Sequence, residues 1–203
     1  MKKSLGEKSG LAAPMKKGKI IILASPSGGG KSTMTKKILS DFDEVKFSVS
    51  ATTRKPRYGE TDGEHYHFLP KEEFIKKVEN DDFLEWEELY NGTMYGTLRR
   101  SVENELKKGY FILLDIDVLG ALNVKKMYGK EALGIFLAPP SLDVLAERLR
   151  HRGTETEETL HSRIERAKKE IGYTRCFDEV VVNDDLETAY SQIKKIVINF
   201  INR

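Results

Sequence analysis

Residues 25–33 read Ser25-Pro26-Ser27-Gly28-Gly29-Gly30-Lys31-Ser32-Thr33 and follow directly on the apolar run Ile20-Ile21-Ile22-Leu23-Ala24. A buried strand, a glycine-rich turn and a helix that opens with Lys-Ser-Thr are typical of a phosphate-binding loop, or P-loop. The glycines let backbone N–H groups close around phosphate oxygens. Lys31 can reach the β- and γ-phosphates, and the Ser32 hydroxyl can ligate Mg²⁺. This stretch therefore predicts a nucleoside triphosphate site.

The first position of the loop departs from the usual pattern. A P-loop signature usually begins with a glycine or alanine, and four residues separate it from the Gly-Lys pair; here that first position is Ser25. The alternative interpretation is a glycine-rich turn without a ligand. The strand before the loop and the helix after it favour phosphate binding.

The composition indicates one soluble globular domain with a strongly charged surface. The chain has 203 residues, of which 39% are hydrophobic and 33% charged. A net charge of +2 gives no strong case for nucleic acid, and no run approaches the roughly 18 apolar residues of a membrane helix. The single cysteine, Cys176, cannot form an internal disulfide. We therefore expect a cytoplasmic protein, monomeric or homodimeric, that binds neither nucleic acid nor membranes.

Apolar strands alternate with helical patterns along most of the chain. After the first strand, further strands are expected at residues 110–114, 132–137 and 180–182. This alternation predicts an α/β fold with a parallel sheet covered by helices on both faces. We also expect a strand at residues 47–50 and short antiparallel strands within residues 51–70, where glycine and proline alternate with aromatic residues.

Acidic residues stand where an α/β sheet binds its ligands. Asp115 and Asp117 follow the strand at residues 110–114, which is the placement of an acid that holds Mg²⁺ beside a P-loop. Asn183 follows the last strand in the same way. The carboxyl ends of these strands are therefore expected to meet at the P-loop, although aspartates also serve as simple helix caps.

Two groups of arginines suggest phosphate chemistry beyond the P-loop. Arg54 and Arg57 flank a Lys-Pro pair, and the planar fork of arginine matches phosphate oxygens, so a second phosphate site is expected there. Arg148 and Arg152 lead into a Gly-Thr-Glu-Thr segment, and Arg163 lies on the next helix. Such cations could close over a transferring phosphate and stabilise its charge. Solvated basic surfaces are the alternative for both groups.

Glu85 lies in the partly apolar stretch Phe-Leu-Glu-Trp-Glu. A carboxylate can accept two parallel hydrogen bonds from the N1–H and N2–H₂ groups of guanine, a donor pair that adenine lacks. Hydroxyl groups such as those of Ser50 and Thr97 could donate to guanine O6. By spacing alone, a surface glutamate is the commoner interpretation.

Taken with the P-loop, these residues resemble the guanylate kinase family. Residues 47–57, with the sequence Phe-Ser-Val-Ser-Ala-Thr-Thr-Arg-Lys-Pro-Arg, are similar to the family's GMP-binding signature. Further matching motifs follow in order: Glu85-Trp86, Tyr95-Gly96-Thr97, Leu114-Asp115-Ile116-Asp117, Ala138-Pro139-Pro140-Ser141, Arg152-Gly153-Thr154-Glu155-Thr156 and Val182-Asn183-Asp184. The resemblance covers residues 18–200.

The resemblance implies ATP-dependent, Mg²⁺-assisted phosphorylation of GMP to GDP by a P-loop nucleoside monophosphate kinase fold. It implies a flexible basic tail at residues 1–17 and a kinase domain at residues 18–203. Within that domain we expect a core (18–50, 98–142 and 167–203), an inserted GMP-binding subdomain (51–97) and a lid (143–166).

The resemblance also implies roles for individual residues. ATP would be bound by Ser25, Pro26, Ser27, Gly28, Gly29, Gly30, Lys31, Ser32, Thr33 and Asn183. GMP would be bound by Ser50, Glu85 and Thr97 at its base, by Arg54, Arg57, Tyr66 and Tyr95 at its phosphate, and by Asp117. Mg²⁺ would be held by Ser32 and Asp115, directly or through water. Catalysis would depend on Lys31, Arg54, Arg148, Arg152 and Arg163.

Two other classes of function compete with this interpretation. Interaction domains of scaffold proteins keep the guanylate kinase fold but typically lack the P-loop lysine, which is present here as Lys31. A small kinase for another phosphorylated acceptor would not need Glu85 at the base. Ser25 and Leu119, which stands where the family has Gln, are the departures that put local loop geometry in question.

Overall fold

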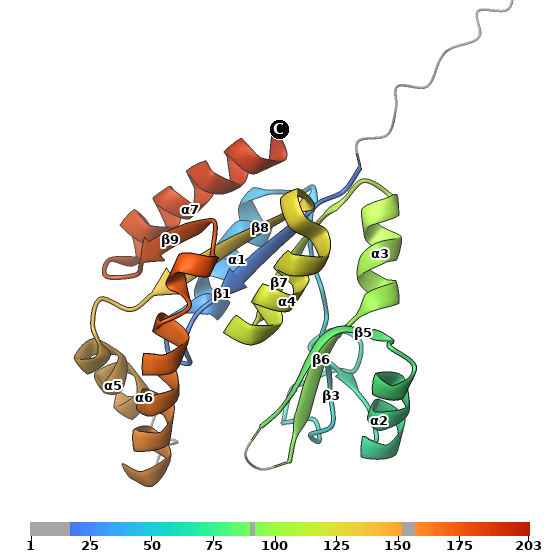
Figure 1. Cartoon of the computed structure of the whole chain (residues 1–203), viewed down its shortest axis with the longest axis horizontal. Helices are drawn as coiled ribbons and strands as arrows, with labels where there is room; N and C mark the ends of the chain where they lie inside the picture. The colour runs from blue at the N-terminus through green and yellow to red at the C-terminus, as the bar shows by residue number, and fades with distance from the viewer. Residues whose placement is uncertain (1–16, 90–91, 152–156) are drawn as a thin grey trace, which may run out of the picture.

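The computed structural model describes residues 17–89, 92–151 and 157–203. The strands form two separate sheets (Figure 1). The larger sheet has five parallel strands in the order β2-β7-β1-β8-β9. Its strands are β1 (Ile20–Ala24), β2 (Val45–Phe47), β7 (Phe111–Ile116), β8 (Ala132–Ala138) and β9 (Glu179–Val182).

Helices cover both faces of the larger sheet, as the alternation of the sequence predicts. On one face lie α1 (Lys31–Asp41) and α7 (Leu186–Ile201), and on the other lie α3 (Arg99–Lys107) and α4 (Val118–Tyr128). Two more helices, α5 (Leu142–His151) and α6 (Glu157–Ile171), pack against each other beside the sheet (Figure 1). Short 3₁₀ turns, η1 (Gly129–Glu131) and η2 (Thr174–Cys176), precede β8 and β9. No helix in the described ranges is long and apolar enough to cross a membrane.

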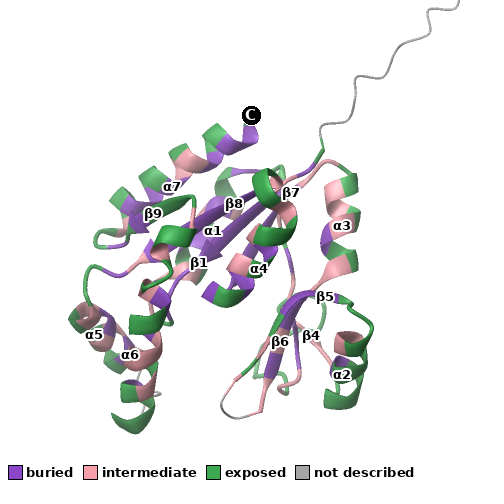
Figure 2. Cartoon of the chain, viewed as in Figure 1, coloured by how far each residue is buried: buried purple, intermediate pink, exposed green. Residues whose placement is uncertain are grey.

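Burial on both faces explains why β1 is continuously apolar. Ile21 and Leu23 belong to a core cluster with α1 and α7, whereas Ile20 and Ile22 belong to a second cluster with α3 and α4. Figure 2 shows the central strands buried throughout. The P-loop therefore leaves a strand that is fixed from both sides.

The smaller sheet has the order β4-β3-β6-β5 and packs against α2 (Lys71–Glu79). Its strands are β3 (Ala51–Thr52), β4 (His67–Phe68), β5 (Phe83–Glu88) and β6 (Met94–Leu98). In Figure 1 this sheet extends away from the core on one side, and the α5–α6 pair extends on the other.

Two expectations about strands are wrong. The strand expected at residues 47–50 ends at Phe47, because the chain leaves the core sheet there; the N–H of Ser48 makes a last bond to the Leu113 carbonyl at 3.1 Å. Residues 51–70 do not pair only in antiparallel fashion. β3 pairs with β4 in parallel and with β6 in antiparallel fashion, since the connection between β3 and β4 crosses back to the same end of the sheet.

Candidate active site

The P-loop curls through two glycines with left-handed backbone. Gly28 and Gly30 have φ values of +93° and +96°, which residues with a side chain rarely adopt. Lys31 opens α1, and its Nζ donates to the Ser25 carbonyl at 3.1 Å. The same nitrogen lies 3.9 Å from Oδ1 of Asp115. The lysine is therefore held over the loop, beside the carboxyl end of β7.

Asn183 supports the loop from behind. Its buried side-chain amide donates to the Gly29 carbonyl at 2.9 Å, and a Cβ on Gly30 would lie only 2.4 Å from that amide nitrogen. A guanidinium nitrogen of Arg148 donates to the Asn183 carbonyl at 2.9 Å. In this structure Arg148 and Asn183 thus brace the loop, and their contacts with ATP stay predictions.

Asp115 and Ser32 are the residues predicted to hold a metal ion. Burial raises the pKa of Asp115, and Lys31 opposes that rise. Oδ2 of Asp115 lies 3.4 Å from the hydroxyl of Thr35, while Ser32 and Thr33 are exposed in the first turn of α1. No group of three His, Cys, Asp or Glu side chains gathers within the described ranges. One carboxylate and one hydroxyl suit Mg²⁺ that takes its other ligands from phosphates and water.

Arg54 is oriented by Glu60, a residue to which the sequence analysis gives no role. Two nitrogens of Arg54 each lie 2.6 Å from a separate oxygen of Glu60, and the backbone N–H of Arg57 donates to Glu60 at 2.7 Å. The hydrogen bonds from Arg54, and then from Arg57, lower the pKa of Glu60 to about 2. Glu60 therefore stays ionised and holds the guanidinium in one orientation.

Aromatic rings form a wall beside this pair. The Arg54 guanidinium lies 4.8 Å from the centre of the Tyr66 ring, and the Tyr66 and Tyr95 rings meet edge to face at 5.9 Å. Burial raises the pKa of Tyr66. Arg57 is exposed and lies in the turn that follows Arg54. Of the residues expected at the GMP phosphate, Tyr95 thus lies on β6, and the others lie in the loop between β3 and β4.

Glu85 is buried, with 7% of its surface exposed. It pairs with Thr97 across β5 and β6, and the Thr97 hydroxyl donates to its Oε1 at 2.5 Å. Burial raises the pKa of Glu85 to about 7, and the charge of Asp117 adds to the rise while Thr97 opposes it. Since the Thr97 hydroxyl is directed at Glu85, its expected contact with guanine stays a prediction.

Asp117 and Gly120 close the site on the side of α4. Oδ1 of Asp117 caps this helix by accepting the N–H groups of Leu119 and Gly120 at 2.8 and 3.0 Å. A Cβ on Gly120 would lie 2.7 Å from Oε2 of Glu85 and 3.0 Å from Oδ2 of Asp117. Only a residue without a side chain lets Glu85 reach this position.

One pocket of about 530 Å³ brings ten of the expected residues together. They are Ser25, Ser27, Lys31, Ser50, Tyr66, Glu85, Tyr95, Asp115, Asp117 and Arg163. Arg163 donates to the Ser27 hydroxyl at 2.9 Å, so α6 reaches the P-loop. Other expected residues support this wall rather than line it, including Thr97 and Asn183. Arg152 lies outside the described residues.

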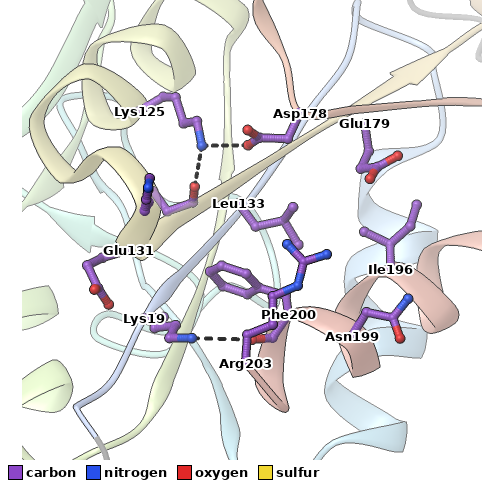
Figure 3. Close-up of a pocket in the computed structure, with 12 residues that line it drawn as sticks. Lys19, Lys125, Glu131, Leu133, Asp178, Glu179, Ile196, Asn199, Phe200 and Arg203 are labelled. Carbon is purple, nitrogen blue, oxygen red and sulfur yellow. Dashed lines mark hydrogen bonds and ion pairs between the residues drawn. The ribbon is translucent and has the colours of Figure 1, made fainter.

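A second pocket, of about 560 Å³, lies where β8 and β9 begin, beside the end of α7 (Figure 3). Two of its cations have partners: Lys125 bonds Asp178 at 2.7 Å, and Lys19 lies over the Phe200 ring at 5.0 Å and contacts the Phe200 carbonyl. None of the residues of the glycine-rich loop lines this pocket. The 530 Å³ pocket, which Lys31 lines, is therefore the candidate for phosphate binding.

Comparison with known proteins identifies the family of this chain. The family model described as guanylate kinase matches residues 17–199. The chain belongs to the guanylate kinase family. It is 47% identical to the guanylate kinase of Porphyromonas gingivalis over 184 residues, which cover 90% of this chain and 98% of that protein. It is 48% identical to the guanylate kinase of Salinibacter ruber over 183 residues, which cover 90% of this chain and 97% of that protein.

A solved structure of the family shares the fold. The crystal structure of guanylate kinase from Anaplasma phagocytophilum superposes with a TM-score of 0.72 at 33% identity, and the match covers 91% of this chain and 87% of that one. The expected α/β kinase fold is confirmed. Membership of the guanylate kinase family, expected from the motifs, is confirmed too.

Three further residues shape the pocket and have no role predicted from the sequence: Glu87 and Glu170 line it, and Gly120 lies against Glu85. Arg166 also lines the pocket, and the sequence predicts only that it could add its charge to that of Arg163 on the same helix. Its ion pair with Glu87 joins residues that are distant in sequence, so no local pattern could reveal it.

Proposed function

We propose that this protein transfers the γ-phosphoryl group of ATP to GMP, giving ADP and GDP. Family membership supports this activity. The observation that carries it is the presence of Glu85, a buried carboxylate suited to guanine, in the same pocket as Lys31 of the P-loop. In this proposal, the same pocket would bind the triphosphate of ATP and the base of GMP.

Glu85 would select the base. In its ionised form it accepts hydrogen bonds from guanine N1–H and N2–H₂, and Thr97 orients it for that contact. Adenine presents an acceptor at N1 and would leave the buried carboxylate unmatched, at a cost of about 1–3 kcal/mol or more. Ser50 lines the same pocket and could donate to O6.

The phosphate of GMP would lie beside Arg54, with Arg57, Tyr66 and Tyr95 around it. A GMP phosphate oxygen attacks the γ-phosphorus of ATP in line, a new P–O bond forms, and the bond to the ADP oxygen breaks. Positive charge on Lys31 and Arg163 stabilises the equatorial oxygens of the transferring group. Arg148 and Arg152 are proposed to add to this charge once ATP is bound.

Ser32 and Asp115 are the residues that would hold Mg²⁺. When bound there, Mg²⁺ would supply positive charge against the negative charge of the phosphates. A covalent enzyme intermediate is not expected, since neither Cys nor His occurs among the described residues that line the pocket. The protein would therefore act by positioning and by electrostatic stabilisation.

The test is ADP release from ATP and Mg²⁺ with GMP, AMP, CMP or UMP as the acceptor. We expect turnover with GMP to exceed that with the other acceptors by at least about 100-fold. Lys31→Met serves as the control, because a variant without the P-loop lysine should be inactive and any ADP that it releases measures contaminating kinase activity. Turnover of another acceptor with none of GMP would overturn the proposal. A cytoplasmic location and a monomeric or homodimeric state stay predictions.

A further inference from the structure

Arg166 bridges two carboxylates that come from different parts of the fold. Its Nε lies 2.7 Å from Oε1 of Glu170, one turn further along α6. One of its terminal nitrogens lies 2.6 Å from Oε1 of Glu87, on β5 of the smaller sheet. The guanidinium therefore connects α6 directly with the sheet that carries Glu85.

Glu170 fixes one end of this bridge. Only 9% of its surface is exposed, and it accepts from Arg166 within the same helix. A buried carboxylate left without a partner is costly, so Arg166 stays anchored on α6. Its remaining nitrogens then point away from α6 along a defined direction, because the guanidinium is planar and rigid.

Glu87 occupies the other end and is tied geometrically to Glu85. Residues two apart on a strand face the same side, so Glu85 and Glu87 both face the pocket. The side chains of Arg166 and Glu87 are only 28% and 29% exposed, so water screens this pair weakly. Glu88 faces the opposite side and forms its ion pair with Lys71 inside the smaller sheet's own unit, at 3.7 Å.

We infer that Glu87 and Arg166 are positioning residues for the acceptor. Their ion pair joins β5 to α6 and so holds Glu85 at a fixed distance from the P-loop and Arg163. The pair sets how far the two sides of the pocket approach before GMP arrives. Loss of the pair lets β5 move away from α6. Part of the free energy of GMP binding is then used to bring β5 and α6 together.

This inference rests on the proposed function, and kinetics test its consequence. Glu87→Gln keeps the shape of the side chain and removes its charge. We expect the KM for GMP to rise about tenfold, because the acceptor now binds only the fraction of molecules in the closed arrangement. The KM for ATP should stay within about twofold and kcat within about threefold, since the P-loop is unchanged.

Glu88→Gln is the matched control, because it removes an ion pair from the same strand that does not cross the pocket. It should leave the KM for GMP within about twofold of the unmodified protein. Arg166→Lys keeps the charge but replaces two bonding nitrogens by one, so it should resemble Glu87→Gln. A rise in the KM for GMP that is equal in Glu87→Gln and Glu88→Gln would overturn the inference.

A distance measurement tests the bridge without any turnover. The native Cys176 is exposed and can carry one spin label, and Lys76→Cys on α2 supplies the other. Without nucleotide, Glu87→Gln should shift the label separation to longer distances, whereas Glu88→Gln should not. Unchanged distances in Glu87→Gln would overturn the inference even if GMP is phosphorylated. Failure of the unmodified protein to phosphorylate GMP would instead contradict the proposed function.

Discussion

The Ser25 hydroxyl occupies the space that a side chain on Gly29 would need. A Cβ on Gly29 would lie 2.6 Å from Oγ of Ser25 and 2.9 Å from its Cβ. Ser25 is buried, and its hydroxyl donates to the Pro26 carbonyl at 3.0 Å. The unusual serine and the central glycine of the loop therefore form one packing unit.

A double-mutant cycle tests this packing unit. Gly29→Ala should raise the KM for ATP about tenfold and destabilise the protein by about 1–3 kcal/mol, because the methyl group overpacks the loop against Ser25. Ser25→Gly combined with Gly29→Ala should return the KM to within about threefold of its starting value. ADP release and urea unfolding measure the two effects. Strictly additive effects would mean that the two positions do not share this space.

The raised pKa of Glu85 predicts how GMP affinity depends on pH. Guanine donates both hydrogen bonds and so requires the ionised carboxylate. In the free protein the pKa of Glu85 is about 7, so the carboxyl group becomes protonated as the pH falls below that value. The KM for GMP should therefore rise by up to about tenfold per unit as the pH falls below 7. Glu85→Gln should lose about 100-fold in kcat/KM and show none of this dependence, apart from the titration of the GMP phosphate itself.

The stability of the protein should also depend on the protonation of Glu85. The protonated carboxyl favours folding, whereas the ionised carboxylate favours GMP binding. In the unfolded chain Glu85 has a pKa near 4.5, and in the folded protein it is about 7, so the folded state holds a proton that the unfolded state has lost. The free energy of unfolding therefore falls as the pH rises from about 4.5 to about 7. Relative to the unmodified protein, Glu85→Gln should gain about 1–3 kcal/mol between pH 4 and pH 8, measured by urea unfolding. A stability difference that does not change with pH would contradict the buried, protonated carboxyl.

Glu60 should matter for GMP although it is not expected to touch the base. Glu60→Gln removes the charge that orients Arg54. We expect the KM for GMP to rise about tenfold with little change in the KM for ATP, because a misoriented guanidinium cannot meet the phosphate with both nitrogens. Glu64→Gln, in the exposed turn nearby, is the control and should behave like the unmodified protein.

Gly120→Ala should weaken the binding of GMP through a direct clash with Glu85. The new methyl group would lie 2.7 Å from Oε2 of Glu85 and displace it. The KM for GMP should therefore rise about tenfold or more, while helix α4 itself gains from the replacement of glycine by alanine. Leu119→Ala is the control, because Leu119 is 55% exposed and faces solvent. Equal effects at the two positions would point to the helix rather than to Glu85.

Much of the fold follows from local sequence, because its signals are local. The apolar run at Ile20–Ala24 is buried on both faces as expected, and Ser141 caps α5 by accepting the N–H of Val144 at 3.1 Å. The alternating stretch at residues 47–50 predicts a strand, but the chain leaves the sheet at Phe47 for a reason that lies in the tertiary fold. Alternation indicates an extended chain but does not identify its partner strand.

Some residues of the site can be predicted from local motifs, and others depend on tertiary contacts. The P-loop and Arg54 belong to short motifs with a mechanism, so the sequence alone assigns them a function. Arg166 joins Glu87 and Glu170, and Gly120 lies against Glu85, through contacts that only the folded chain creates. Distances between β5, α4 and α6 are not encoded in any local spacing.

In the proposed reaction, one pocket reads guanine with Glu85 and holds the triphosphate with the P-loop. A crystal structure with GMP and a non-hydrolysable ATP analogue tests it most directly, through the distance from the Glu85 carboxylate to guanine N1 and N2. We predict hydrogen bonds of about 3 Å at both nitrogens, with the triphosphate on Lys31. A carboxylate more than about 8 Å from the base, well beyond hydrogen-bond reach, would contradict the account.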